Sequence, residues 1–154
     1  MAKQLARPTP EPEPELYERD FYTWCLEQAA LVRAGRLAEL DLENVAGELE
    51  SLGGEQANAL RSFYRVLLIH LLKWRYQSGR RSRSWIVTIV RERGNAAERL
   101  AGNPGLRQHQ RRLFTEAYDR ARKEAASETG LPLSVFPKES PFTPEQALDE
   151  DFWP

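Results

Sequence analysis

The chain has 154 residues, 41% of them hydrophobic and 29% charged, and its formal net charge is −1. A chain of this length fits one domain that buries enough apolar surface to need neither disulfides nor a structural metal. A single cysteine excludes an intramolecular disulfide and a cysteine-cluster zinc site. Without a secretory signal or an apolar run of transmembrane length, we expect a soluble, cytoplasmic protein with no membrane association.

The charges are segregated along the chain. Residues 1–52 contain 5 Lys+Arg against 11 Asp+Glu, residues 53–126 contain 16 against 6, and residues 127–154 contain 1 against 6. A basic middle between acidic ends indicates either a surface for an anionic partner or internal neutralisation, in which the acidic ends pack over the basic centre. Both interpretations stay open at this point.

The N-terminal part divides into a leader and two helices. Alternating prolines and glutamates (PTPEPEPE) predict a flexible leader over residues 1–15, followed by a single helical domain over 16–154. A first helix is expected to begin near Asp20, with its apolar face over residues 21–32. A second is expected to begin at Asp41, a favourable N-cap, and to end at Gly53. The apolar stripe of the second helix consists of Leu42, Val45, Ala46, Leu49 and Leu52.

Two further helices are expected in the middle of the chain. The third helix, over residues 55–76, is apolar around most of its circumference, which is typical of a helix buried among others. Ser82 or Ser84 provides an N-cap for the fourth helix, whose buried side is expected to run from residue 85 to residue 100.

The C-terminal part predicts a fifth helix and an ordered strap. Asn103-Pro104 is a signal for a helix start, and Gly130-Leu131-Pro132 is a signal for its end. Residues 131–154, the C-terminal strap, keep too many apolar side chains for a free tail despite their prolines. Thr143-Pro144-Glu145 predicts one short helix within the strap. We therefore expect an all-α, compact bundle of about five helices with a proline-rich, ordered C-terminal strap.

Four stretches of the chain carry a resemblance to a known family. They read DFYTWCLEQAALVRAGRLAELDLENVAGELESLG, RVLLIHLLKWRYQSGRRSRSWIVTI, AYDRARKEAASETGLPLSVFP and SPFTPEQALDEDFWP. Over about residues 16–154 the chain resembles the bacterial family known as domain of unknown function 29. The resemblance implies an all-helical fold and brings no established activity.

The segment 73–85 combines cations with aromatic rings, and Arg91 and Arg93 extend its positive charge. Arginine pairs with phosphate through two parallel hydrogen bonds, and flat rings stack on nucleic-acid bases. The pattern indicates binding of nucleic acid or another polyanion, although the same arginines can pair with Glu48, Glu50 or the acidic strap. The candidate anion-binding residues are Lys73, Arg75, Arg80, Arg81, Arg83, Trp74, Tyr76 and Trp85.

An enzyme is a further alternative. Glu48 and His70 are the weak catalytic candidates, with His70 as the base, in a group that would also hold Lys73, Arg81 and Trp85. A lone histidine on an apolar helix face is more typical of a hydrogen-bonded core residue. Two histidines leave few ligands for a metal of the His/carboxylate type, so we expect neither a metal site nor a cofactor.

Among these interpretations, the sequence favours a non-catalytic protein-interaction or structural domain. The proline leader, the aromatic-rich loop after residue 73 and the acidic ending DEDFWP are compatible with a protein partner or with self-association. Nucleic-acid binding through residues 73–93 is the first alternative, and catalysis at Glu48 and His70 is the second.

Overall fold

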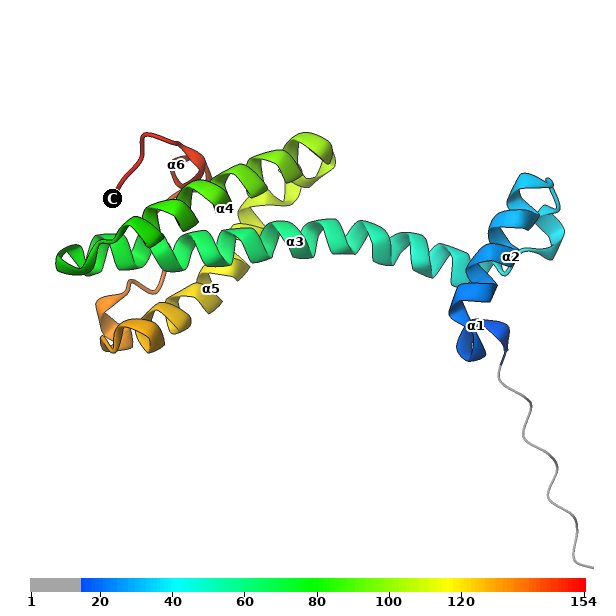
Figure 1. The fold of residues 1–154 in the computed structure, drawn as a ribbon, viewed down its shortest axis with the longest axis horizontal. Helices are drawn as coiled ribbons and strands as arrows, with labels where there is room; N and C mark the ends of the chain where they lie inside the picture. The colour runs from blue at the N-terminus through cyan, green and yellow to red at the C-terminus, as the bar shows by residue number, and fades with distance from the viewer. Residues whose placement is uncertain (1–14) are drawn as a thin grey trace, which may run out of the picture. The chain divides into compact units, whose positions relative to one another are not determined.

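The computed structural model describes residues 15–154, in which the secondary structure is helical and no strand occurs (Figure 1). The all-α class is therefore confirmed. The leader expected over residues 1–15 lies outside the described residues except for Glu15. The chain divides into two compact units, Met1–Ser51 and Leu52–Pro154, here called the first unit and the second unit. The single domain expected over 16–154 stays a prediction.

The first unit contains two helices and the beginning of a third. Helix α1 (Leu16–Arg19) and helix α2 (Phe21–Arg33) are followed by a 3₁₀ turn (Leu37–Glu39). Helix α2 begins next to Asp20, as expected, and Asp20 caps it, because its carboxylate accepts a hydrogen bond from the Thr23 amide at 3.0 Å. The chain leaves α2 through Gly35, whose φ of +69° is a conformation that glycine adopts without a steric penalty.

The two helices expected on either side of Gly53-Gly54 form one helix, α3 (Leu42–Tyr76). The expected N-cap is confirmed, since the Asp41 carboxylate accepts from the Asn44 amide at 3.3 Å. The expected break is wrong. A glycine inside a helix costs about 1 kcal/mol relative to alanine, which weakens a helix but does not remove any of its backbone hydrogen bonds, whereas a proline would.

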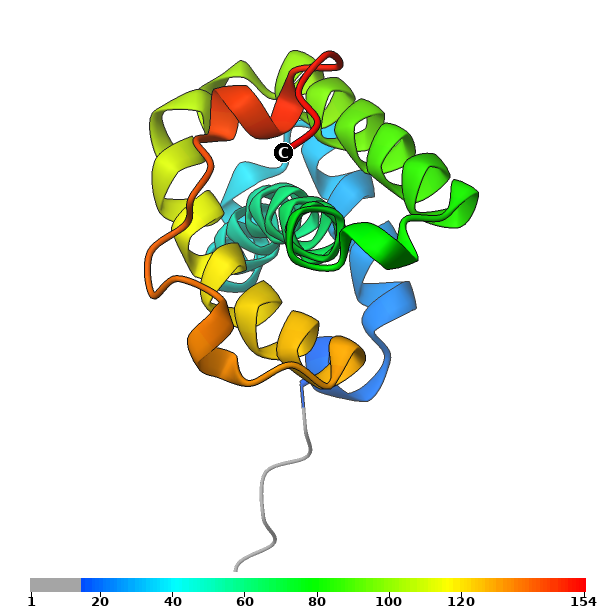
Figure 2. The ribbon, with the colours of Figure 1, turned by 90° about the vertical axis from the view of Figure 1, so that its left-hand side faces the viewer.

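The second unit is built around the C-terminal half of α3. Looking along this helix, Figure 2 shows α4, α5 and the strap arranged around it. The elements after α3 are α4 (Arg83–Gly102), α5 (Gln110–Thr129) and α6 (Pro144–Leu148), with 3₁₀ turns at Ser78–Arg80, Pro104–His109 and Leu133–Val135. In place of the five expected helices, the described residues thus contain four long helices and the short α1 and α6.

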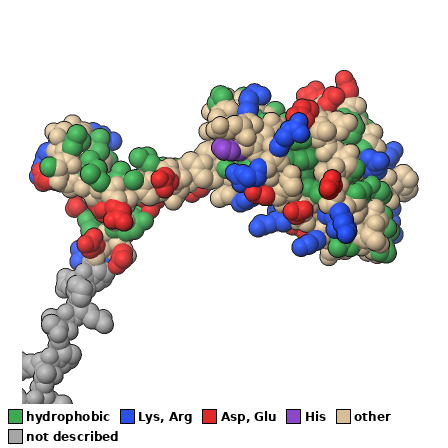
Figure 3. Space-filling model, turned by 180° about the vertical axis from the view of Figure 1, so that it is seen from behind, with side chains coloured by type: hydrophobic (Ala, Val, Ile, Leu, Met, Phe, Trp, Pro, Cys, Tyr) green, Lys and Arg blue, Asp and Glu red, His purple; other side chains and the backbone are tan. Residues whose placement is uncertain are grey.

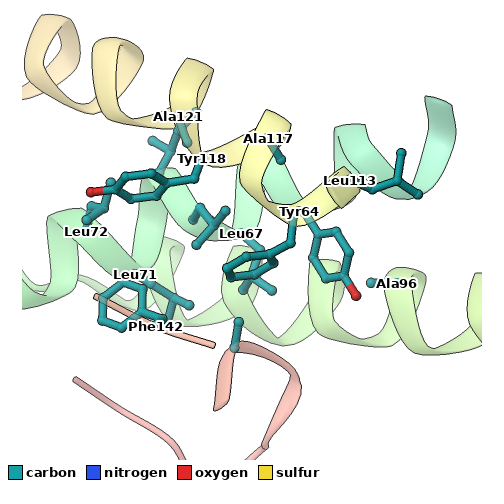
Figure 4. Packing of buried hydrophobic residues seen from close by; sticks show 14 of the residues in the cluster. Tyr64, Leu67, Leu71, Leu72, Ala96, Leu113, Ala117, Tyr118, Ala121 and Phe142 are labelled. Carbon is teal, nitrogen blue, oxygen red and sulfur yellow. The ribbon is translucent and has the colours of Figure 1, made fainter. Parts of the chain in front are cut away.

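The core of the second unit lies where α3, α4 and α5 meet (Figure 4). The side chains that α3 contributes to this core lie on several sides of the helix. This agrees with the prediction that α3 is apolar around most of its circumference. Two tyrosines are buried there with their hydroxyls hydrogen-bonded. Tyr64 accepts from Gln110 at 2.8 Å, and Tyr118 donates to the Pro137 carbonyl at 2.6 Å. Burial raises the pKa of each to about 12.

The ends of the later helices follow the sequence signals with one exception. Ser82 caps α4 by accepting from the Trp85 amide, and Gly130 ends α5 with a φ of +71°. The exception is Asn103-Pro104, which starts a 3₁₀ turn, so α5 begins six residues later than the signal. The Asn103 side chain instead donates to the Arg99 carbonyl at the end of α4.

The strap is ordered and packs against the helices of the second unit, as expected. Phe136, Phe142 and Ala147 are buried in its core. The short helix α6 begins with a complete capping box between Thr143 and Gln146, with Pro144 in the first turn.

Candidate functional site

The basic segment 73–93 was the first sequence candidate, and its aromatic rings already contact cations of the same chain. The Lys73 ammonium donates to Glu128 at 2.7 Å and lies 4.8 Å from the centre of the Trp85 ring. The Arg75 guanidinium lies 5.7 Å from the Tyr76 ring and equally far from the Phe142 ring. Such cation–π contacts occupy ring faces on which a nucleic-acid base would stack.

Arg81 and Trp74 contact the last residues of the strap. The Arg81 guanidinium donates to the Trp74 carbonyl at 3.0 Å and to the Pro154 carbonyl at 3.3 Å. It also lies 4.7 Å from the centre of the Trp74 ring. Trp74 in turn packs on Trp153, with ring centroids 5.0 Å apart. This part of the basic segment therefore holds the strap in place.

Arg93 is the most buried cation of the described residues, and it also holds the strap. Its guanidinium donates to the carbonyls of Ala147 at 2.8 Å, Glu150 at 3.3 Å and Phe152. Burial lowers the pKa of Arg93, while the nearby Asp149 and Glu150 carboxylates act in the opposite direction. The strap thus accepts the hydrogen bonds of Arg81 and Arg93 through backbone carbonyls, although the charge pattern had suggested that its carboxylates would pair with them.

Arg75, Arg80, Arg81 and Arg83 of the anion-binding set are exposed, and Arg75 and Arg81 make the ring and carbonyl contacts described above, which leaves Arg80 and Arg83. Among the described contacts, neither takes part in an ion pair or a side-chain hydrogen bond. Two arginines without free aromatic neighbours make a smaller anion-binding surface than the sequence pattern indicated.

Glu48 and His70, the weak catalytic candidates, belong to different units. Glu48 lies in the first unit and accepts a hydrogen bond from the Tyr17 hydroxyl. His70 lies in the second unit, half-buried, with its Nδ1 2.9 Å from the Val66 carbonyl one turn earlier. Burial lowers the pKa of His70, and Lys73 and Arg91 lower it further. The contacts of His70 are those of a histidine bonded to its own helix.

The feature that sequence reasoning missed is an exposed apolar surface on the first unit. Within residues 15–51 only the Trp24 side chain is buried. Seven large hydrophobic side chains are between 47% and 74% exposed. We call them the first-unit apolar surface, and they are Phe21, Tyr22, Leu26, Val32, Leu37, Leu42 and Leu49.

Several of these side chains had been expected on buried faces, and that expectation is wrong. Phe21 and Val32 belong to the predicted apolar face of α2, and Leu42 and Leu49 belong to the predicted stripe of α3; all four are exposed. The physical reason is size, because a unit of about fifty residues with two short helices cannot surround every apolar side chain. In the second unit, Ile86 is also exposed although its spacing placed it on the buried side of α4.

Acidic side chains outnumber basic ones in the first unit. Residues 15–51 contain 3 Lys+Arg against 9 Asp+Glu. On the face of this unit that Figure 3 shows, hydrophobic side chains lie among acidic ones. Exposed apolar groups rimmed by polar side chains are typical of protein-binding surfaces.

A small polar network organises the first unit beneath this surface. The Trp24 indole donates to the Asp41 carboxylate at 3.1 Å, and the Asp41 amide donates to Gln28 at 2.9 Å. Hydrogen bonds from Asn44 lower the pKa of Asp41. Tyr17 packs edge-on against Trp24, with ring centroids 4.9 Å apart. The network ties α2 to the start of α3, which leaves the apolar side chains around it facing solvent.

A hollow lined by side chains of the second unit lies between α5 and the strap. It has a volume of about 510 Å³. Its charged lining consists of Arg111 and Lys138 together with Asp119 and Glu139. Opposite charges in equal number give this hollow no preference for an anion or a cation.

The sequence did contain a signal for part of the apolar surface. Leu42, Val45, Leu49 and Leu52 follow one another at intervals of three and four residues, which is the a/d spacing of a helix that pairs with another helix. The spacing indicates an apolar stripe, but a stripe that packs in the chain's own core has the same spacing as one that receives a partner.

The comparisons with known proteins bear on family but not on activity. Among the curated proteins and the solved structures, none matches the chain. Within residues 15–154, no helix has both the length and the apolar character needed to cross a membrane, and no three His, Cys, Asp or Glu side chains are grouped as metal ligands. The family model for Domain of unknown function DUF29 matches residues 16–153, and the chain therefore belongs to that family.

Proposed function

We propose that this chain is a non-catalytic protein-interaction domain that receives its partner on the first-unit apolar surface. The observation that carries the proposal is the concentration of exposed large hydrophobic side chains in residues 15–51, where a single residue is buried. Each such side chain left in water forgoes roughly 1.5–3 kcal/mol of burial free energy, so covering several of them supplies a large driving force for association.

Charge defines the kind of partner. With 9 Asp+Glu against 3 Lys+Arg in residues 15–51, the surface favours an apolar partner face that carries Lys or Arg at its rim. The stripe of Leu42, Val45 and Leu49 on α3 has the spacing that receives an amphipathic helix. The expected partner is therefore a basic amphipathic helix.

The two alternatives have less support. For nucleic acid or another polyanion, the rings of Trp74, Tyr76 and Trp85 already contact cations or other rings of the chain, which leaves Arg80 and Arg83. For an enzyme, Glu48 and His70 make their hydrogen bonds to Tyr17 and to Val66, each within its own unit. Neither Glu48 nor His70 therefore belongs to a group of free polar side chains around a hollow, which catalysis would need.

Site-specific photo-cross-linking in living cells tests the proposal. A benzophenone amino acid at position 49 should give an adduct that the same group at position 120, exposed on α5, does not give. The protein in the adduct is then purified and its affinity for the chain is measured by calorimetry. Leu42→Lys combined with Leu49→Lys should weaken that binding by about tenfold or more, because two cations replace apolar contacts.

The proposal fails if position 49 gives no adduct beyond those of position 120. It also fails if the purified partner binds the double variant as tightly as it binds the wild-type chain.

A further inference from the structure

A second unpartnered apolar face lies on α4 in the second unit. Val87 and Val90 are 55% and 56% exposed, and Ile86 lies beside them at 38%. Further along the same side of the helix, Gly94 and Ala97 are also exposed. These positions recur every three or four residues, so they form one stripe along the outer side of α4. We call it the α4 outer face.

The rim of the α4 outer face is predominantly basic. Arg83 lies in line with the stripe at the start of the helix, and Arg80 precedes it; both are exposed. Arg91 lies on one side and pairs with Glu92 at 2.8 Å, and Glu98 is the single exposed carboxylate at this rim. The face therefore has the composition expected of a partner for the first-unit apolar surface: apolar along its centre and basic at one end.

The charges of the two units decide which pairing between copies is favourable. Residues 15–51 contain 3 Lys+Arg against 9 Asp+Glu, and residues 52–154 contain 17 against 12. Contact between the first units of two copies would bring two strongly acidic surfaces together. Contact between the first unit of one copy and the second unit of another joins opposite net charges, which lowers the electrostatic free energy of association.

We propose that the partner of the first-unit apolar surface is a second copy of this chain, and that the surface binds the α4 outer face of that copy. The inference rests on the proposed function and names its partner. Val87 and Val90 pack against Leu42 and Leu49, while Arg80 and Arg83 lie near the acidic rim of the first unit. Two equivalent contacts of this kind close a dimer, the commonest symmetric assembly.

Light scattering after size-exclusion chromatography tests the assembly. The full chain should have the mass of a dimer, and raising the salt concentration should shift the equilibrium toward monomer because the rim charges are screened. Two double variants each remove one side of the contact. The first is Leu42→Lys with Leu49→Lys, and the second is Val87→Glu with Val90→Glu. Each should raise the dissociation constant by about tenfold or more.

The control is Val135→Glu, which changes a valine that is 39% exposed in the strap and should leave the dimer unchanged. Circular dichroism of every variant should match the wild type, because the substituted side chains lie at the surface.

Mixing the two double variants separates this contact from other ways of pairing. The first variant keeps an intact α4 outer face and the second keeps an intact first-unit apolar surface, so one contact of each heterodimer is the native one. In the other contact the new lysines face the new glutamates. The mixture should therefore dimerise at a concentration at which each variant alone is mostly monomeric. Pairing between like faces would leave one of the variants dimeric on its own.

The inference is overturned if the wild-type chain is a monomer at all accessible concentrations, if either double variant dimerises with the dissociation constant of the wild type, or if the mixture does not pair. The proposed function is tested separately. Suppose that the chain is monomeric but that position 49 cross-links to another protein whose binding is lost in the lysine variant. The proposed function is then supported, and the proposal that the partner is a second copy is wrong.

Discussion

Arg93 is a charged residue at a position where the spacing of α4 predicts a core side chain, and it is 3% exposed. Burying a cation is unfavourable unless its hydrogen-bonding capacity is filled. Here the guanidinium donates to three carbonyls of the strap and lies 5.1 Å from the centre of the Trp153 ring. Arginine suits this position because its donors are spread over a planar group that reaches several carbonyls at once.

Replacing Arg93 should loosen the strap and lower the stability of the second unit. In Arg93→Met the carbonyls of Ala147, Glu150 and Phe152 lose their donor, and we expect the free energy of unfolding to fall by about 3 kcal/mol. Urea denaturation followed by tryptophan fluorescence measures the change. Arg83→Met, at an exposed position of the same helix, should change stability by less than about 0.5 kcal/mol. Equal effects of the two substitutions would contradict this role of Arg93.

His70 makes the stability of the second unit dependent on pH. Burial lowers its pKa from the ordinary 6.5, as do Lys73 and Arg91, whereas the bond to the Val66 carbonyl and the charge of Glu128 act in the opposite direction. A histidine with a lowered folded-state pKa binds a proton more readily in the unfolded chain. The contribution of His70 to the free energy of unfolding is therefore complete above the unfolded-state pKa of about 6.5 and is lost as the pH falls below that value.

Replacing this histidine by a side chain that does not titrate should flatten the pH dependence. We expect the free energy of unfolding of the wild type to decrease from about pH 7 to pH 5 more steeply than that of His70→Gln. Urea denaturation at a series of pH values measures the difference. His109→Gln changes the other histidine, at an exposed position, and should retain the wild-type slope. A slope for His70→Gln as steep as that of the wild type would show that other groups produce it.

At the scale of the elements, α3 runs through two consecutive glycines. Gly53 and Gly54 lie within the 35-residue helix, and a β-carbon added at either position would have no atom within 4 Å. The two glycines therefore make no close contact that requires the absence of a side chain. Their effect on the helix is the entropic cost of ordering glycine, together with the exposure of the helix backbone to water.

Alanine at these positions should stabilise α3. Gly53→Ala and Gly54→Ala are each expected to raise the free energy of unfolding by about 0.5–1 kcal/mol, since alanine fits the helix and restricts the unfolded chain. Thermal denaturation followed by circular dichroism measures the change. Gly130→Ala is the contrasting variant, because its φ of +71° is unfavourable for any residue with a β-carbon and it should destabilise. Destabilisation by all three would show that α3 needs flexibility at Gly53-Gly54.

At the scale of the whole molecule, different interactions stabilise the interior of each unit. The second unit has a continuous core of side chains from α3, α4, α5 and the strap. The first unit relies on the Trp24–Asp41 network and a few aromatic contacts, with one buried residue among those described. Stability within one chain is not uniform, and segments with few buried apolar contacts open at a lower free energy.

Amide hydrogen exchange should be faster in the first unit than in the core of the second unit. We expect amides of α2 to exchange faster than amides of α5 and of the buried segment 60–72 of α3. In Trp24→Ala the exchange of α2 should become faster still, while α5 keeps its wild-type protection. Mass spectrometry of peptic fragments resolves these segments. Equal exchange rates in α2 and α5 would mean that residues 15–51 share the stability of the main core.

Several features of this protein follow from the sequence alone. The period of the apolar residues predicts an all-helical chain, and Asp20, Asp41, Ser82 and Gly130 mark helix ends correctly because capping depends on the few backbone groups near each residue. The buried character of residues 60–72 follows from apolar side chains around the whole helix, since only a helix enclosed by others hides them all.

Other features were decided only by the tertiary structure. Leu42 and Leu49 have the spacing of a core stripe, yet they are exposed because no neighbouring element of the first unit covers them. Likewise, the arginines of the basic middle were expected either to bind an external anion or to pair with carboxylates. Arg81 and Arg93 instead donate to carbonyls of the strap. Spacing reports which side of a helix is apolar, and contacts between segments distant in the chain determine what lies against it.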